Sequence, residues 1–288
     1  MYVEASMIET ILVPTDFTIE SEELLACVGE FKNAGLKKVV LLHVVDIYQA
    51  QGLAPMFEEN AKKKIMDYKK LLDEIGIDAI TLVIHGDVKK TIVQVADEEN
   101  VDCIVMGATT SGLRGRLIGR TTEYISRESG KIVLIEKYDT LKESEEELYI
   151  KACSAKFSKV MLPVDMSENS RTLLDEISGL ADIIDELVFV HVLEDVKSEE
   201  LEITKEQSLN SLSKLGSKFK SDLEVSYYVS EGKPAEVIDS LAEELGITLI
   251  AITNRGIGSL KDILLGSTAE SLLRKTRKPV LLVPVSKR

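Results

Sequence analysis

Short and nearly unbroken apolar runs recur along the first part of the chain and alternate with longer segments of helical period. The runs are Ile11–Pro14, Val39–Val45, Ala79–Ile84, Val101–Met106 and Lys131–Ile135. Runs of this length and composition are typical of strands that are buried on both faces of a parallel sheet. Between them, apolar residues return at spacings of three and four, which predicts amphipathic helices.

The same pattern returns in the second part of the chain. Ile11–Thr18 corresponds to Val160–Ser167, and Val40–Val44 corresponds to Val188–Val192. Further matches join Asp102–Gly107 to Thr248–Thr253, and the offsets stay between 146 and 149 residues. An offset this long and this steady indicates one duplicated domain. We therefore expect a first domain over residues 1–140, an acidic linker over 141–156 and a second domain over 157–288.

Each copy reads as five strands that alternate with helices, so the predicted fold class is α/β. We expect two tandem doubly wound, Rossmann-like domains, each a five-stranded parallel sheet flanked by helices. Thr18 and Ser167 are predicted to cap the first helix of each copy, and Gly76 and Gly216 to close the second. In such sheets ligands bind where the strand order reverses, which directs attention to the loops after the first and fourth strands.

A Pro-x-Asp triplet follows the first strand of each copy, as Pro14-Thr15-Asp16 and as Pro163-Val164-Asp165. A carboxylate at this place could accept hydrogen bonds from a ribose hydroxyl or an adenine amine. It could equally serve only to end the strand and cap the helix.

After the fourth strand, the second copy has Thr253-Asn254-Arg255-Gly256 and, after nine intervening residues, Gly266-Ser267-Thr268. Glycines permit close approach of the backbone to a phosphate, and a helix start attracts anions. Residues 253–278 hold six basic groups against two acids in an otherwise acidic chain. The alternative is an ordinary glycine turn that leads into an amphipathic helix.

In combination these motifs resemble the universal stress protein family in its tandem two-domain form, with a fold like that of the adenine nucleotide alpha hydrolases. The family's nucleotide-binding members carry Gly-x2-Gly-x9-Gly-Ser/Thr after strand four and an Asp after strand one. The resemblance implies an adenine nucleotide, ATP or AMP, with Mg²⁺ accompanying ATP. It also implies a role as a stress-response sensor or regulator that acts through nucleotide-dependent protein interaction. Carried over to the second copy, the binding residues are Pro163, Val164, Asp165, Val192, Ile252, Thr253, Arg255, Gly256, Gly266, Ser267 and Thr268.

The first copy departs further from the family motif. Thr110 stands at the second glycine, the spacer is one residue shorter, and Arg120 follows Gly119. Its corresponding residues are Pro14, Thr15, Asp16, Val44, Met106, Gly107, Thr110, Gly119, Arg120 and Thr121. We expect the second site to bind nucleotide and the first to bind weakly or differently.

Composition narrows the function and the location. Lys and Arg number 35 against 49 Asp and Glu, and the formal net charge of −14 argues against a general nucleic-acid binder. No apolar run approaches the length of a membrane helix. The first residues carry acid where a signal peptide carries base. The three cysteines lack the spacing of a zinc site. A cytoplasmic location is expected.

Nothing in the sequence marks a catalytic site, because there is no Gly-x4-Gly-Lys-Ser/Thr loop and no legible acid–base arrangement. At most, slow hydrolysis of bound ATP is expected, and no metal-ligating residue is assigned. The final strands, Ile132–Ile135 and Val280–Val283, are expected to be sheet edges with unpaired backbone groups. The resemblance implies that they pair antiparallel with each other and that the chain forms a homodimer through edge strands. The partners implied are therefore a second copy and an unidentified protein client. The competing interpretation is a tandem interaction scaffold of the same family that binds no nucleotide.

Overall fold

The computed structural model describes residues 8–48, 54–108, 118–137, 155–219, 223–256 and 265–285. Tertiary contacts divide the chain into two compact units. We call the described residues up to 137 the first half and those from 155 onward the second half. Within the described ranges, no helix is both long and apolar enough to cross a membrane.

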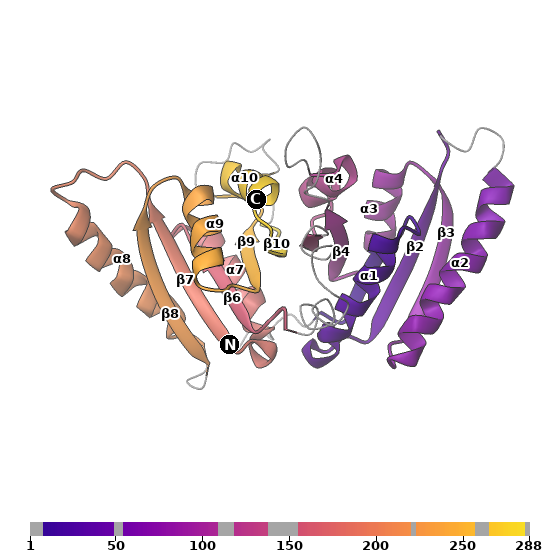
Figure 1. The fold of residues 1–288 in the computed structure, drawn as a ribbon, viewed down its shortest axis with the longest axis horizontal. Coiled ribbons are helices and arrows are strands. Elements are labelled where there is room, and N and C mark those ends of the chain that lie inside the picture. The colour runs from indigo at the N-terminus through magenta and orange to yellow at the C-terminus, as the bar shows by residue number, and fades with distance from the viewer. Residues whose placement is uncertain are drawn as a thin grey trace. The chain divides into compact units, whose positions relative to one another are not determined.

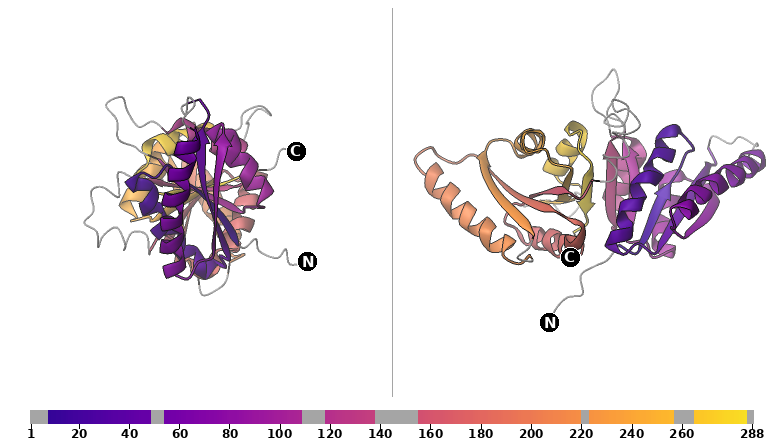
Figure 2. Two further views of the ribbon diagram at one scale, coloured as in Figure 1. Left: turned by 90° about the vertical axis from the view of Figure 1, so that its right-hand side faces the viewer. Right: turned by 60° about the horizontal axis from the view of Figure 1, so that its bottom comes forward.

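The first half is a five-stranded parallel sheet with helices on both faces (Figures 1 and 2). Its elements are β1 (Thr10–Pro14), α1 (Ile19–Val28), the 3-10 helix η1 (Gly29–Ala34), β2 (Lys38–Asp46), α2 (Ala54–Glu74), β3 (Ala79–Gly86), α3 (Val88–Glu98), β4 (Cys103–Ala108), α4 (Arg120–Glu128) and β5 (Ile132–Lys137). The strand order is β3-β2-β1-β4-β5. Helix α1 packs against α2, and α3 packs against α4, so one pair covers each face of the sheet.

The second half repeats this arrangement. Its elements are β6 (Lys159–Pro163), α7 (Glu168–Ser178), the 3-10 helix η2 (Ala181–Ile183), β7 (Glu186–Leu193), α8 (Leu201–Gly216), β8 (Glu224–Glu231), α9 (Pro234–Glu244), β9 (Leu249–Thr253), α10 (Ser267–Lys275) and β10 (Val280–Val283). The strand order is β8-β7-β6-β9-β10, and all these pairings are parallel. The predicted α/β class, with a five-stranded parallel sheet in each copy, is confirmed.

The cores explain why the strands read as apolar runs. Residues Val39–Leu42 of β2 are all 0% exposed, because helices cover both faces of the central strands. Strand β4 continues two residues beyond the predicted run, because Gly107 and Ala108 pair with the last two residues of β5. A glycine in a strand weakens the sequence signal, so this extension was not predicted.

The helix ends follow the predicted caps, with one correction. The Ser167 hydroxyl accepts from the Asn169 amide at 3.2 Å and caps α7. Gly76 has a φ of 72° and ends α2 as expected. Gly216 ends α8 as expected, and the correction is that it is not among the described glycines with positive φ. Its place requires glycine for another reason, since a Cβ there would lie 2.2 Å from the Tyr227 hydroxyl.

Candidate functional site

In the first half, the central strand separates from one neighbour towards its carboxyl end. Strand β1 pairs with β2 as far as Pro14, but with β4 only at Ile11 and Leu12. The strand order reverses between β1 and β4. Loops that leave the sheet at such a point run in opposite directions and leave a crevice between them.

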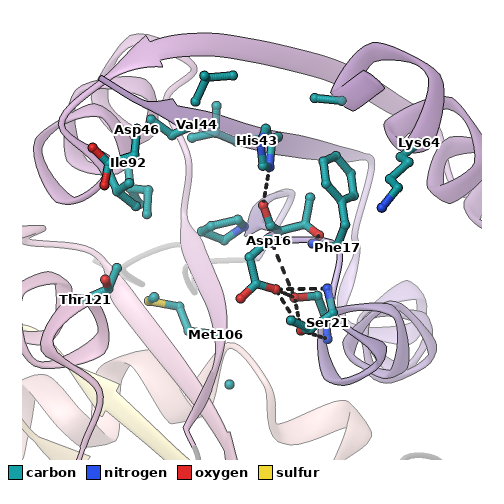
Figure 3. Close-up of a pocket in the computed structure, with 18 of the residues that line it drawn as sticks. Asp16, Phe17, Ser21, His43, Val44, Asp46, Lys64, Ile92, Met106 and Thr121 are labelled. Carbon is teal, nitrogen blue, oxygen red and sulfur yellow. Dashed lines mark hydrogen bonds between the residues drawn. The ribbon is translucent and has the colours of Figure 1, made fainter. Parts of the chain in front are cut away.

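A cavity of about 1210 Å³ lies at this crevice (Figure 3). Its lining comes from the ends of β1, β2 and β4 and from helices α1, α2, α3 and α4, all within the first half. Eight of the residues expected at a nucleotide site line it: Pro14, Thr15, Asp16, Val44, Met106, Gly107, Gly119 and Thr121. The fold therefore gathers these residues from four separate segments around one space.

The carboxylate of Asp16 is held in place by the turn that follows it. Its Oδ1 accepts hydrogen bonds from the Thr18 amide at 3.1 Å, the Thr18 hydroxyl at 2.7 Å and the Ser21 hydroxyl at 2.5 Å. Burial raises the pKa of Asp16, but the hydrogen bonds from Ser21 and Thr18 outweigh burial and hold this pKa below its ordinary value. Asp16 is therefore a fixed, charged acceptor at neutral pH.

His43 fixes the backbone just before Asp16. Its Nδ1 lies 2.9 Å from the Thr15 carbonyl oxygen. A carbonyl oxygen only accepts hydrogen bonds, so Nδ1 carries the proton and Nε2 is the bare nitrogen of the neutral ring. Burial lowers the pKa of His43 by more than the Thr15 carbonyl and the Asp16 carboxylate raise it, so the ring is neutral at pH 7. The Phe17 ring stacks on the imidazole with 4.4 Å between centroids.

Helix α4 begins at Arg120 beside the cavity. Gly119 is its N-cap and makes no side-chain cap hydrogen bond. The Thr122 hydroxyl donates to the Gly107 carbonyl at 3.2 Å, which ties the helix start to the end of β4. An N-terminus capped by glycine keeps its first amides open to an anion, and the helix dipole favours negative charge there.

The second half opens a crevice at the corresponding place. Strand β6 pairs with β7 as far as Pro163 but with β9 only over its first residues. The Asp165 Oδ1 accepts from the Ser167 amide at 3.0 Å, from the Ser167 hydroxyl and from the Ser170 hydroxyl at 2.8 Å. The turn that holds the carboxylate is thus the same in both halves.

The hydrogen bond between a histidine ring and the backbone next to the aspartate is also repeated. The Nδ1 of His191 lies 2.8 Å from the Val164 carbonyl oxygen. The residue after each aspartate has a left-handed φ, 61° at Phe17 and 60° at Met166. Both copies therefore keep the same backbone geometry around the aspartate, although they differ in the side chain at this strained position.

In the second half, the expected motif glycines lie next to the aspartate. The Gly266 amide donates to the Asn254 carbonyl at 2.7 Å. A Cβ on Gly266 would lie 3.2 Å from the Gly256 nitrogen, and a Cβ on Gly256 would lie 3.4 Å from the Asp165 Oδ2. Helix α10 begins at Ser267, with Gly266 as an N-cap that makes no side-chain cap hydrogen bond. These contacts juxtapose a carboxylate, two glycine backbones and a helix start.

Thr253 stands where the family motif has its first glycine. Its hydroxyl donates to the Arg255 carbonyl at 2.7 Å, and the Asn169 side-chain amide reaches the same oxygen at 3.4 Å. The threonine thus helps to shape the turn after β9.

A cavity of about 490 Å³ in this half lies elsewhere, among residues at and after the ends of β7 and β8, and includes none of the expected site residues.

Sequence comparison places this geometry in a known group of proteins. The model of the universal stress protein family matches residues 7–137 and, a second time, residues 156–284. The chain belongs to the universal stress protein family. It carries two of the family's domains in tandem, as the repeat predicted.

Known universal stress proteins resemble one half or the whole of the chain. One from Methanocaldococcus jannaschii is 32% identical over 155 residues, which cover 96% of that protein and 46% of this chain. A second from the same organism is 30% identical over 142 residues, covering 84% of that protein and 46% of this chain. The crystal structure of one from Archaeoglobus fulgidus matches with a TM-score of 0.74 and 25% identity, covering 96% of this chain and 98% of that chain.

Within this universal stress protein, the remaining predicted residues take these positions. Arg120 is the first residue of α4, is exposed and is not part of the cavity lining, and Thr110 lies outside the described residues. In the second half, Val164 and Ile252 are buried, whereas Ser267 is exposed. Val192, Arg255 and Thr268 are half-buried.

The cavity also has walls that sequence reasoning did not name. Phe17, Ser21 and Lys64 line it, together with Ile92 of α3. A comparison of the two copies could have found Ser21, because a serine follows each aspartate at the same spacing, as Ser21 and Ser170. Lys64 and Ile92 carry no such signal, since only packing brings α2 and α3 to the sheet edge. Within the described ranges, no cluster of three or more His, Cys, Asp or Glu is placed to hold a metal ion.

Proposed function

We propose that this universal stress protein binds an adenine nucleotide, ATP or AMP, in each half and acts as a stress-response sensor or regulator. The observation that carries the proposal is the first-half cavity, where the segment after β1 and the end of β4 meet the end of β2 and the start of α4. A concave site with a few convergent polar groups at a topological switch point is the usual place for such a ligand.

Each group at the crevice has a role in this proposal. Asp16 and Asp165 accept hydrogen bonds from ribose hydroxyls or the adenine amine, which suits a charged carboxylate fixed by three donors. Val44 and Met106 form the apolar wall for the base in the first half, as Val192 and Ile252 do in the second. The open N-termini of α4 and α10 receive the phosphates. Mg²⁺ would accompany ATP at the phosphates.

The two halves support the proposal in different ways. The second half keeps more of the family's motif, and Gly256, Gly266 and Asp165 lie close together there. The first half departs from the motif, yet eight of its expected residues line a cavity of about 1210 Å³. We therefore propose that both halves bind, although sequence reasoning alone favours the second.

The deciding experiment counts nucleotides per chain. Small molecules released by denaturing the purified protein are quantified by mass spectrometry, and the emptied protein is titrated calorimetrically with ATP, ADP and AMP. We expect about two nucleotides per chain at saturation, falling to one in Asp16→Asn and to one in Asp165→Asn. Asp175→Asn, the same change on an exposed part of α7, is the control and keeps both.

Other outcomes assign the function differently. A count of one that only Asp165→Asn abolishes would confine binding to the second half. An empty protein that gives no heat with any of the three nucleotides would contradict the proposal and favour the interaction scaffold. We further propose a cytoplasmic homodimer that contacts its second copy through edge strands and signals to a protein client.

A further inference from the structure

The first-half cavity extends beyond the residues that a nucleotide motif accounts for. One side of it is formed by Phe57, Asn60, Ala61, Lys63 and Lys64 of α2. At about 1210 Å³ it also exceeds the roughly 300–1,000 Å³ of ordinary small-molecule sites. Figure 3 places Lys64 and Thr121 on opposite sides of Asp16, so the α2 side is separate from the start of α4. This side has room for a further group.

The lysines of α2 differ in whether they form ion pairs, and this difference concerns the α2 side of the cavity. Four of them form ion pairs with acids of the same helix: Lys62 with Glu58, Lys63 with Glu59, Lys69 with Asp73 and Lys70 with Asp67. Lys64 forms no ion pair within the described part of the chain. It is also the lysine whose ammonium lies over a ring of the cavity wall. Its charge is therefore available to a ligand.

A rigid aromatic platform positions this ammonium. The Lys64 Nζ lies 5.6 Å from the centre of the Phe17 ring. That ring stacks on His43 and meets the Tyr68 ring edge-on at 5.6 Å, while the Tyr68 hydroxyl donates to the Thr18 carbonyl at 3.4 Å. A cation over a ring face gains electrostatic attraction without being neutralised, so it keeps its ability to bind an anion.

The second half has no counterpart of this arrangement. Met166 replaces Phe17 and is 37% exposed, so it offers no ring. At the repeat offsets of 146–149 residues, Lys64 corresponds to one of Asn210, Ser211, Leu212 and Ser213, none of which is basic. The feature thus occurs in one copy only, and the duplicated fold does not require it.

We propose that Lys64, backed by Phe17, is an additional oxyanion subsite of the first half, on the side of Asp16 away from α4. The group it takes is a phosphate-type anion, either a free oxyanion beside the nucleotide or a second phosphorylated unit of the same ligand. The inference rests on the proposed nucleotide site, because both lie in one cavity. It makes the first half selective for ligands with more negative charge than AMP alone.

The test compares Lys64→Gln with Lys62→Gln in the full chain. Both changes remove one positive charge from α2, but Lys62 is paired with Glu58 and does not line the cavity. Calorimetry measures the affinity for AMP, for AMP in the presence of inorganic phosphate, and for diadenosine tetraphosphate. The ³¹P linewidth of inorganic phosphate, recorded without nucleotide, reports the subsite by itself. Lys64 is exposed, so the variant is expected to fold.

We expect Lys64→Gln to narrow the phosphate line and to weaken binding of the more charged ligand about threefold to fivefold, as fits an exposed ion pair. We expect the AMP affinity of Lys64→Gln to equal that of the unaltered protein. Lys62→Gln should leave both the phosphate linewidth and all the affinities unchanged. A gain from added free phosphate identifies a separate oxyanion, and a gain only with the dinucleotide identifies a second unit of one ligand. Equal losses for AMP and the charged ligands, or no loss at all, would overturn the subsite. The nucleotide proposal for this half would be overturned instead if Asp16→Asn left AMP binding unchanged while Lys64→Gln still narrowed the phosphate line.

Discussion

At the crevice of each half, one histidine and one aspartate are tied to the same short stretch of backbone. His43 bonds to the Thr15 carbonyl, and the next residue, Asp16, is held by three donors from its own turn. The same tie joins His191 to Val164 in the second half. The His43 Nδ1 proton is already donated to the Thr15 carbonyl, so this nitrogen has no proton to give to a ligand. We therefore infer that His43 is a positioning residue that holds the backbone next to the Asp16 carboxylate.

A pair of variants tests this role, because asparagine keeps a donor near the position of Nδ1 and glutamine moves it towards Nε2. We expect His43→Gln to weaken AMP binding in the first half about fivefold, and His43→Asn to bind nearly as the unaltered protein does. Calorimetry in an Asp165→Asn background isolates the first half. The reverse order of the two variants would assign the role to Nε2 and contradict the tie to Thr15.

The same histidine predicts a pH dependence of stability. Burial holds the pKa of His43 below its ordinary value in the folded protein, so the unfolded chain takes up the proton first as pH falls. Folding stability from this group is present above about pH 6.5 and declines below it. Urea unfolding at pH 7 and pH 5.5 should show a smaller loss in His43→Asn than in the unaltered protein. An equal loss in both would mean that other groups carry the acid sensitivity.

At the scale of elements, the helices α4 and α10 begin alike but differ in how closely other residues pack around their N-cap glycines. Both have a glycine N-cap, Gly119 and Gly266, with φ and ψ that alanine also adopts. Among the residues that the structure describes, a Cβ on Gly119 would meet only the Thr122 hydroxyl at 3.8 Å, whereas a Cβ on Gly266 would press on the Gly256 nitrogen at 3.2 Å. Packing therefore favours glycine at the start of α10, whereas no close contact with a described residue favours it at the start of α4.

Gly266→Ala and Gly119→Ala form a matched pair that tests this difference. Both lose the same small preference for glycine at an N-cap, so the comparison isolates the steric effect. We expect Gly266→Ala to cost about 1–2 kcal/mol more in unfolding free energy and to weaken nucleotide binding in the second half. Chemical denaturation and calorimetry give the two readouts. Similar losses of unfolding free energy in both variants would show that the turn at Gly256 can move to accept the added methyl group, and would contradict the steric explanation.

For the molecule as a whole, the duplication produced two halves in which the first strand separates from one neighbour at the same place. Every residue that lines the large cavity belongs to the first half, and the contacts among Asp165, Gly256 and Gly266 belong to the second. The relatives from Methanocaldococcus jannaschii, which this chain covers over 96% and 84% of their length, each correspond to about half of it. Under the proposed function, each half is therefore expected to bind its ligand as a separate unit.

Hydrogen exchange can test whether the two units act separately. We expect AMP to slow exchange in both halves of the unaltered protein and, in Asp165→Asn, only in the first half. A ligand present at 100 times its Kd stabilises the unit it binds by about 2.7 kcal/mol, which is a readily measured protection. Loss of protection in both halves of Asp165→Asn would show that the sites are coupled and would contradict independent units.

The sequence by itself determined the duplication, the fold class and the crevice. Apolar runs at a steady offset give two sheets, because strands buried on both faces must be apolar along their whole length. The aspartates follow the first strand of each copy, so their place at the crevice follows from chain order. Only the tertiary structure decided which side chains from α2 and α3 reach that crevice, since Lys64 and Ile92 lie far from the motifs along the chain. It also revealed a cavity of about 1210 Å³ at the crevice of the copy with the weaker motif, because the helices that line this cavity are placed by packing.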